Sequence, residues 1–192
     1  TQAYHGQIGF FGYTANATIK NLGIENASIN FPSESNANVG GMIGYGAATV
    51  TNCFVKNSEI LAPNLRYYQT GGFVGKTRFA STFENCYVYG CTVAAKDNSN
   101  VAGFMSAVER DGNIVTNCYV ANTTVGSKNQ AAVYPFIVNK GKTITVENCY
   151  SDLAPATGAT DKVANQYNAD YAYGTYTTSK SDITGAFEDV SG

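Results

Sequence analysis

The residues of this chain best suited to chemistry are its five cysteines, because thiolates act as nucleophiles, bind soft metals and form disulfides. Four of them follow an asparagine, at intervals of 33, 32 and 31 residues: Cys53, Cys86, Cys118 and Cys149. A cysteine that recurs so regularly indicates either a redox or metal signature, or a structural position that each repeat reuses. The residues around each cysteine decide between these interpretations.

The cysteines do not form the ligand set of a metal site. Cys86 and Cys91 make one C-x4-C pair, no second pair accompanies them, and the only histidine is His5. If the four repeated cysteines stack in register, their Cβ atoms run parallel about 4.8 Å apart, farther than the ~3.8 Å of a disulfide. Leu22 takes the same position in the first repeat. We therefore predict free, inert thiols that fill the core, with no metal and no cofactor.

Other residue types give little support for catalysis. The chain has no His-Glu-x-x-His signature and no calcium-binding glycine–aspartate nonapeptide. Glu84 and Glu147 share one repeat position but lie two repeats apart, about 10 Å at strand spacing, which is too wide for a retaining glycosidase pair. The segment 71–77 imitates a phosphate-binding loop, but that motif needs glycine where this chain has Thr70. We predict that the chain is not an enzyme.

The asparagine before each cysteine marks a repeat of 31 to 33 residues, with five copies: Asn21, Asn52, Asn85, Asn117 and Asn148. Two residues before this marker the side chain is always apolar, and one residue before it is always polar. The positions three and eight residues after it are apolar in the first four copies. This alternation with period two predicts short half-buried strands, and the 3.6-residue period of helical repeats is missing.

Three short strands per repeat, separated by glycine and asparagine corners, predict an all-β, right-handed parallel β-helix of about five coils. The asparagine side chains would hydrogen-bond from coil to coil. We place the solenoid at residues 1–151, with coils at 8–38, 39–70, 71–100, 101–130 and 131–151. Variable polar loops fall at 31–38, 62–70 and 95–100. Residues 152–192, where the pattern stops, are predicted to form a C-terminal cap or a linker.

Two outward features are candidates for binding. The position two residues after the marker predicts an aromatic column of Phe54, Tyr87, Tyr119 and Tyr150. Its rings either stack to stabilise the sheet or offer a strip to a glycan or protein. The second candidate is the longest inter-repeat loop, with Arg66, Tyr67 and Tyr68. Glu25 and Lys56, stacked in adjacent coils, predict an ordinary ion pair.

Composition narrows the range of partners. The formal net charge is −2 and charged residues are 14% of the chain, so nothing favours nucleic acid or an anionic membrane. No apolar run approaches the roughly 18 residues of a membrane span. The chain begins at Thr1 without a methionine or a signal peptide, which predicts a processed product or a piece of a longer chain.

The repeat resembles a known family. The segments 71–75 (GGFVG), 83–88 (FENCYV) and 90–93 (GCTV) resemble the GLUG repeat of bacterial secreted and surface proteins, and the resemblance extends over about residues 9–151. That family includes adhesin-like proteins and chains named as putative immunoglobulin A1 peptidases. The resemblance implies a secreted or cell-surface location and a protein or glycan ligand.

These observations lead to a functional expectation with alternatives. We expect a non-catalytic segment of an adhesin-like protein that binds host or neighbouring macromolecules. One alternative is a carbohydrate-binding or accessory module of a larger secreted enzyme, such as an immunoglobulin A1 peptidase-like protein. An ice-binding array is a further alternative, but it needs unbroken threonine ranks, and Ile114 interrupts the rank that comes closest.

Overall fold

Asparagine and glycine divide each repeat into short straight segments, because both tolerate the left-handed backbone region that a sharp corner needs. The five marker asparagines have φ between 51° and 54°. A second corner follows five residues later, again with positive φ, at Asn26, Asn57, Gly90 and Asn122. The extended segments between corners cannot satisfy their own backbone groups, so they pair with the equivalent segments of the next repeat.

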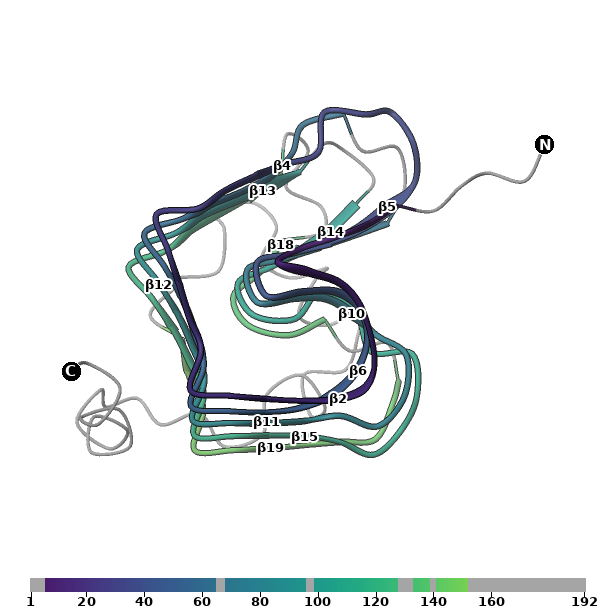
Figure 1. Cartoon of the computed structure of the whole chain (residues 1–192), viewed down its shortest axis with the longest axis vertical. Helices are drawn as coiled ribbons and strands as arrows, with labels where there is room; N and C mark the ends of the chain where they lie inside the picture. The colour runs from purple at the N-terminus through teal and green to yellow at the C-terminus, as the bar shows by residue number, and fades with distance from the viewer. Residues whose placement is uncertain (1–5, 65–67, 96–98, 128–132, 139–140, 152–192) are drawn as a thin grey trace.

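The computed structural model describes residues 6–64, 68–95, 99–127, 133–138 and 141–151, and these wind into a β-solenoid (Figure 1). The described segments contain no helix, and every strand pairing among them is parallel. This confirms the predicted all-β parallel fold. In Figure 1 the N-terminal coil lies nearest the viewer and the chain turns clockwise as it recedes, which is the right-handed sense.

Each coil contributes strands to four parallel sheets, named here in chain order. The first sheet contains β1 (Gly6–Ile8), β5 (Ala37–Gly40), β9 (Tyr68–Gly71), β14 (Ser99–Ala102) and β18 (Val133–Tyr134). The second contains β2 (Phe11–Lys20), β6 (Ile43–Thr51), β10 (Val74–Thr77), β11 (Thr82–Glu84), β15 (Asn113–Thr116) and β19 (Ile144–Glu147). The third contains β3 (Gly23–Glu25), β7 (Phe54–Lys56), β12 (Tyr87–Tyr89), β16 (Tyr119–Ala121) and β20 (Tyr150–Ser151). The fourth contains β4 (Ser28–Asn30), β8 (Glu59–Ala62), β13 (Thr92–Ala95) and β17 (Thr124–Ser127).

The described residues make about four turns. In three of the sheets one further strand, β18, β19 or β20, continues the stack after the fourth turn. The cap or linker predicted at 152–192 lies outside the described residues. The register keeps equivalent repeat positions side by side, as in the row Val50, Phe83 and Val115.

The prediction of three strands per coil was wrong, because each of the first four coils contributes to four sheets, and in the third coil β10 and β11 both belong to the second sheet. The segments expected to be loops at 31–38, 62–70 and 95–100 run into the strands of the first sheet, and Tyr68 begins β9 instead of lying in a loop. These strands escape pattern recognition because they bury polar side chains. Asn38 and Thr70 are buried next to Ala37 and Val39, so apolar and polar residues do not alternate cleanly.

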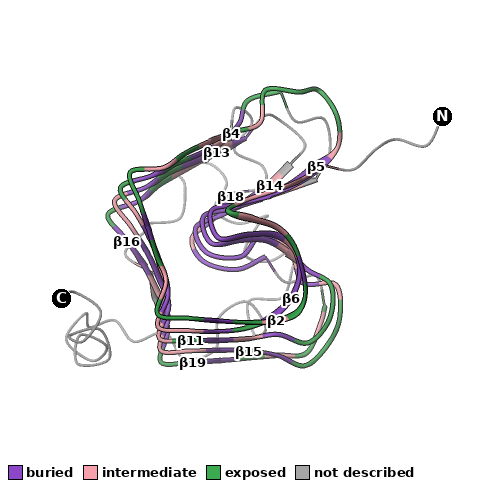
Figure 2. Ribbon diagram, in the orientation of Figure 1, coloured by how far each residue is buried: buried purple, intermediate pink, exposed green. Residues whose placement is uncertain are grey.

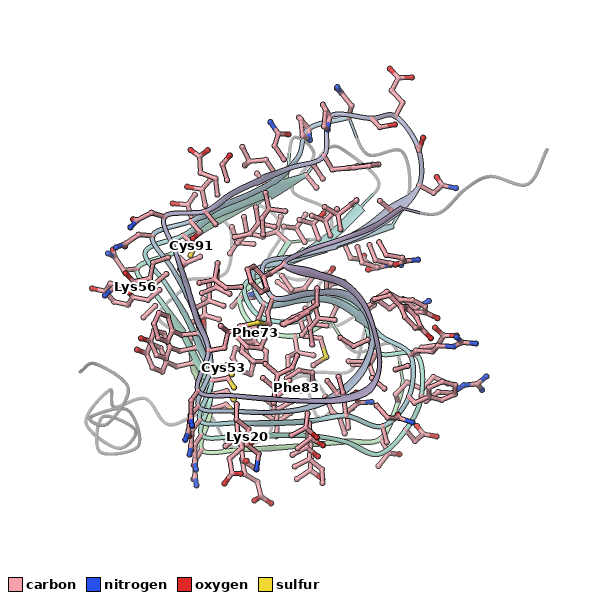
Figure 3. The ribbon with its side chains drawn as sticks, viewed as in Figure 1. Lys20, Cys53, Lys56, Phe73, Phe83 and Cys91 are labelled. Carbon is pink, nitrogen blue, oxygen red and sulfur yellow. The ribbon has the colours of Figure 1, made fainter. Side chains whose placement is uncertain are left out.

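The core lies inside the coil, and the Gly-aromatic segments bend inward to fill it (Figures 1 and 2). Phe73, Phe104 and Phe136 stack along the solenoid with ring centroids 4.8 and 5.1 Å apart. Phe83 meets Phe73 and Phe104 edge-on at 6.2 and 6.0 Å. Figure 3 shows Phe73 and Phe83 pointing into this interior, together with Cys53. These aromatic side chains therefore form a continuous apolar column through the centre of the coil.

Candidate binding surfaces

The repeated asparagines form a hydrogen-bonded ladder along one corner of the solenoid. Each side-chain nitrogen donates to the side-chain oxygen one coil earlier, over 3.1 Å from Asn52 to Asn21 and 3.0 Å from Asn117 to Asn85. Asn85 and Asn148 make the same bond over 3.1 and 3.2 Å. The amide of each inner asparagine is thus engaged in both directions, which gives it a structural role.

The repeated cysteines lie directly behind this ladder. Cys53, Cys86, Cys118 and Cys149 are fully buried and free, and Cys91 is buried and free in a separate column. The Cys118 Sγ lies 3.2 Å from the Thr116 carbonyl oxygen, to which its S–H can donate. Burial in the apolar interior raises the pKa of the Cys118 and Cys91 thiols. Thiols that are buried and protonated are poor nucleophiles.

The predicted aromatic column lies on the third sheet, with its rings stacked face to face. The centroids of Phe54 and Tyr87 are 4.9 Å apart with an interplanar angle of 7°, and those of Tyr87 and Tyr119 are 4.9 Å apart at 3°. The Phe54 ring covers Gly23, where a Cβ atom would lie 2.1 Å from its Cζ. Neighbouring rings thus cover the ring faces, and Tyr87 is only 8% exposed.

The structure describes some of the remaining predicted positions and not others. Tyr150 pairs with Tyr119 along the backbone. Arg66 and Tyr67 lie outside the described residues. The predicted ion pair is confirmed, with Lys56 Nζ 3.4 Å from Glu25 Oε1. Binding by the aromatic column or by the loop stays a prediction.

The structure shows a further surface that the repeat pattern did not reveal. We call it the corner cluster; it lies where the second sheet bends between the Gly-aromatic segment and the marker asparagine. Its members come from three consecutive coils and the turn of a fourth: Tyr13, Tyr45, Lys76, Arg78, Phe79 and Glu109. Tyr13, Tyr45 and Lys76 occupy equivalent positions on β2, β6 and β10. The Tyr13 and Tyr45 rings lie 5.9 Å apart.

Hydrogen bonds and charges connect this cluster across the coils. The Tyr45 hydroxyl donates to Glu109 Oε2 over 2.9 Å, and Lys76 Nζ lies 3.1 Å from the same oxygen. Arg78 Nη1 donates to the Tyr13 hydroxyl over 3.0 Å, and the guanidinium lies 5.1 Å from the centroid of the Phe79 ring. These contacts bind the corner into one network.

The local environment shifts the pKa values of two groups in the network, Tyr45 and Glu109. Burial, followed by the hydrogen bond to Glu109, raises the pKa of Tyr45 to about 12. Burial disfavours the ionised form of Glu109, yet the bonds from Tyr45 and Lys76 outweigh it and hold the pKa of this carboxyl below its usual value. At neutral pH the phenol is protonated and the carboxyl is ionised.

A spacing in the sequence could have revealed this surface. The distance from the second glycine of the Gly-aromatic segment, or from Ser106 in its place, to the marker asparagine is 9, 8, 10 and 11 residues in the first four coils. By contrast, the step from the marker to the second corner is always five residues. A segment whose length varies from coil to coil is not constrained by the stacking of equivalent positions, and such segments often carry the binding residues of a repeat protein.

The described residues hold no group of three or more His, Cys, Asp or Glu side chains positioned to bind a metal ion. Nor does that part of the chain contain a helix of the length and apolarity that a membrane span requires.

No family model, curated protein or solved structure matches the chain.

Proposed function

We propose that this chain is a non-catalytic segment of a secreted or cell-surface, adhesin-like protein that binds host or neighbouring macromolecules. The GLUG-like repeat described above supports this proposal, and so does the architecture. A solenoid presents each outward column as a straight, rigid row, which is a geometry suited to recognition by repeated contacts.

The observation that carries the proposal is the separation of roles between inside and outside. The repeated asparagines, cysteines and phenylalanines are engaged in ladders and stacks within the coil. The side chains that vary from coil to coil gather at the corner cluster, where Tyr13 and Phe79 keep about half of their area exposed, at 49% and 47%. Large exposed aromatic groups beside positioned charges are a common composition of binding surfaces.

The test is an array of glycans and extracellular-matrix proteins, probed with the full 192-residue chain. Two variants report which surface binds: the double variant Tyr87→Ala/Tyr119→Ala removes the stacked column, and Phe79→Ala removes an exposed ring at the corner. Binding that one variant loses and the other keeps assigns the surface. A chain that binds neither the glycans nor the matrix proteins contradicts the proposal.

A control for folding accompanies the column variants. The Tyr87 ring is stacked on both sides, so its loss also weakens the third sheet. The variant Tyr87→Phe/Tyr119→Phe keeps the stack and removes only the hydroxyls. If Tyr87→Ala/Tyr119→Ala loses binding while its far-ultraviolet dichroism matches that of the wild type, the loss belongs to the surface.

The second candidate function is a carbohydrate-binding or accessory module of a larger secreted enzyme. The exposed rings of the corner cluster favour it, since aromatic faces are suited to the apolar faces of sugars. Cosedimentation with insoluble polysaccharides separates the candidates. Binding to polysaccharide with no binding to matrix proteins supports the module, and the reverse supports the adhesin.

A further inference from the structure

We infer that the corner cluster is a binding site for a glycan residue that carries a carboxylate, with Arg78 as its recognition group. This inference names a ligand class within the proposed binding function and rests on that function. The geometry of the charges and rings in the cluster supports it.

Two of the charges in the corner cluster neutralise one another. Lys76 Nζ and Glu109 Oε2 form an ion pair at 3.1 Å, with side chains only 24% and 33% exposed. The Tyr45 hydroxyl donates to the same oxygen, and the Lys76 ammonium lies 5.7 Å from the centroid of the Tyr45 ring. This half of the cluster is therefore an internally satisfied support, with little charge left for a ligand.

Arg78 is held differently. It is exposed, and neither of the ion pairs found among the described residues includes it. One of its five N–H groups donates to the Tyr13 hydroxyl, and the guanidinium carbon lies over the Phe79 ring, 5.1 Å from its centroid. These two neighbours hold the guanidinium, and the exposed side chain keeps its other donors available to a ligand. A guanidinium that forms no ion pair within the protein can donate two parallel N–H bonds to the carboxylate of a ligand.

The two aromatic residues that contact Arg78 add an apolar requirement. Tyr13 and Phe79 belong to the few large apolar or aromatic side chains that stay exposed in the described chain. A small anion such as phosphate would not use these rings. A pyranose with a carboxylate would, because its C–H face packs on an aromatic ring while its acid group meets the guanidinium.

The corner also favours a glycan over an acidic peptide. Extended peptides bind β-proteins mainly by adding a strand to an unpaired edge. Here β6 is paired on both sides, with β2 and with β10, so the centre of the site offers side chains and no free edge. Equivalent positions recur about every 4.8 Å along the stack, comparable to the length of one sugar residue in an extended chain. A linear glycan can thus follow the coils.

Isothermal titration with the full chain tests this inference, using three probes. They are oligogalacturonate, sialyllactose and the neutral maltotetraose, so that uronate and sialate sources are distinguished. The variant Arg78→Gln is expected to weaken binding of the acidic glycan about tenfold or more, since it removes a charge-assisted hydrogen-bond pair. Tyr13→Phe keeps the ring but frees the guanidinium, and is expected to give an intermediate loss.

The matched control is Lys20→Gln. Lys20 is the last residue of β2, whereas Tyr13 of the corner cluster lies near the start of that strand. The Lys20 side chain points outward and carries the same charge as Arg78 (Figure 3). This variant should bind like the wild type, because Lys20 is not part of the corner cluster. A loss of affinity equal to that of Arg78→Gln would indicate general charge attraction and overturn the site.

Other results overturn the inference and leave the broader function standing. One is equal affinity for maltotetraose and the acidic glycans, and another is an Arg78→Gln variant with unchanged affinity. A third is tighter, Arg78-dependent binding of an oligoglutamate peptide, which would make the site one for acidic protein segments. Failure of all three glycans, with binding retained on the protein array, refutes the ligand class but not the binding role.

Discussion

At the scale of single residues, the marker asparagines combine a backbone role and a side-chain role. Their positive φ turns the chain, and their amides bond to the coils before and after. Alanine provides neither property, and glycine provides only the first. The two roles can therefore be separated by substitution.

We predict that Asn85→Ala lowers the free energy of unfolding more than Asn85→Gly does. Alanine at a φ of 52° costs about 1–2 kcal/mol of backbone strain, and both variants lose the amide bonds to Asn52 and Asn117. Urea unfolding followed by circular dichroism measures both variants. Equal losses would show that the amide ladder, and not the turn, determines the role of Asn85.

The buried thiols predict a pH dependence of stability. Burial raises the pKa of Cys118 and Cys91 in the folded chain above the value of about 8.5 for an unfolded cysteine. Above that pH the unfolded chain loses protons that the folded chain keeps, so the stability is complete below about pH 8.5 and declines as the pH rises.

Urea midpoints measured from pH 7 to pH 9.5 test this dependence. The slope should be smaller in Cys91→Ala, which removes one of the thiols involved. A midpoint that rises over this range contradicts the prediction.

The sequence accounts well for the residues that repeat. The columns predicted to be apolar at Val50, Val55 and Ile60 coincide with fully buried positions, because each coil must present the same face to the core. The corner cluster was missed for the opposite reason. Its hydrogen bonds join residues 64 and 65 positions apart, two coils away. Its side chains do not repeat through the coils, since Tyr13 and Tyr45 are followed by Lys76 at the equivalent position. No periodic pattern records such contacts.

At the scale of elements, the first sheet contributes most to the difference between expectation and structure. Its strands carry amides with little exposure to solvent: the Asn38 side chain donates to Gln7 Oε1 over 3.0 Å, and Asn100 donates to Gln69 Oε1 over 2.9 Å. Amide pairs therefore join the first coil to the second and the third coil to the fourth on this sheet. In a sequence such polar residues are typical of loops, and only the pairing partner one coil away shows that they belong to strands.

Glycine positions along the strands differ sharply in their tolerance of a side chain. A Cβ atom on Gly72 would lie 2.1 Å from the Gly103 carbonyl oxygen, which is backbone and cannot move aside. A Cβ atom on Gly126, in β17, would have no heavy atom within 4 Å. We predict that Gly72→Ala displaces the inward turn and strongly destabilises the chain.

Gly126→Ala is the matched control for this prediction. At an open position, alanine is expected to change stability by less than about 1 kcal/mol, in the stabilising direction, through the entropy of the unfolded chain. Thermal unfolding of both variants tests the contrast. Similar melting temperatures for the two would mean that the coils do not approach as closely at Gly72 as the structure shows.

At the scale of the whole molecule, backbone pairing joins each coil only to its neighbours, so the coils act as modules. The side-chain bonds of the corner cluster that reach across two coils are the exception. Removal of one complete coil should then leave a shorter solenoid. Deletion of residues 41–71 joins Gly40 to Gly72 and brings the first coil onto the third. The two now in contact have corner spacings of 9 and 10 residues, and Tyr87 replaces Phe54 above Gly23.

We predict that this deletion variant stays folded, with strand-type circular dichroism and resistance to trypsin like those of the full chain. Deletion of residues 41–61, which removes a fraction of a coil, is the control and should misfold, because every later strand is then out of register. A partial deletion that folds as well as the complete one would argue against modular coils.

The parallel pairing of successive coils has a mechanical consequence. The hydrogen bonds between coils lie along the solenoid axis, so tension on the two ends of the chain separates neighbouring coils one after another. Each coil holds 31 to 33 residues and adds about 4.8 Å of height while folded. Once peeled off and extended, it spans about 100 Å. A solenoid built this way lengthens roughly twentyfold for each coil released, so it absorbs tension while the coils that are still stacked keep their shape.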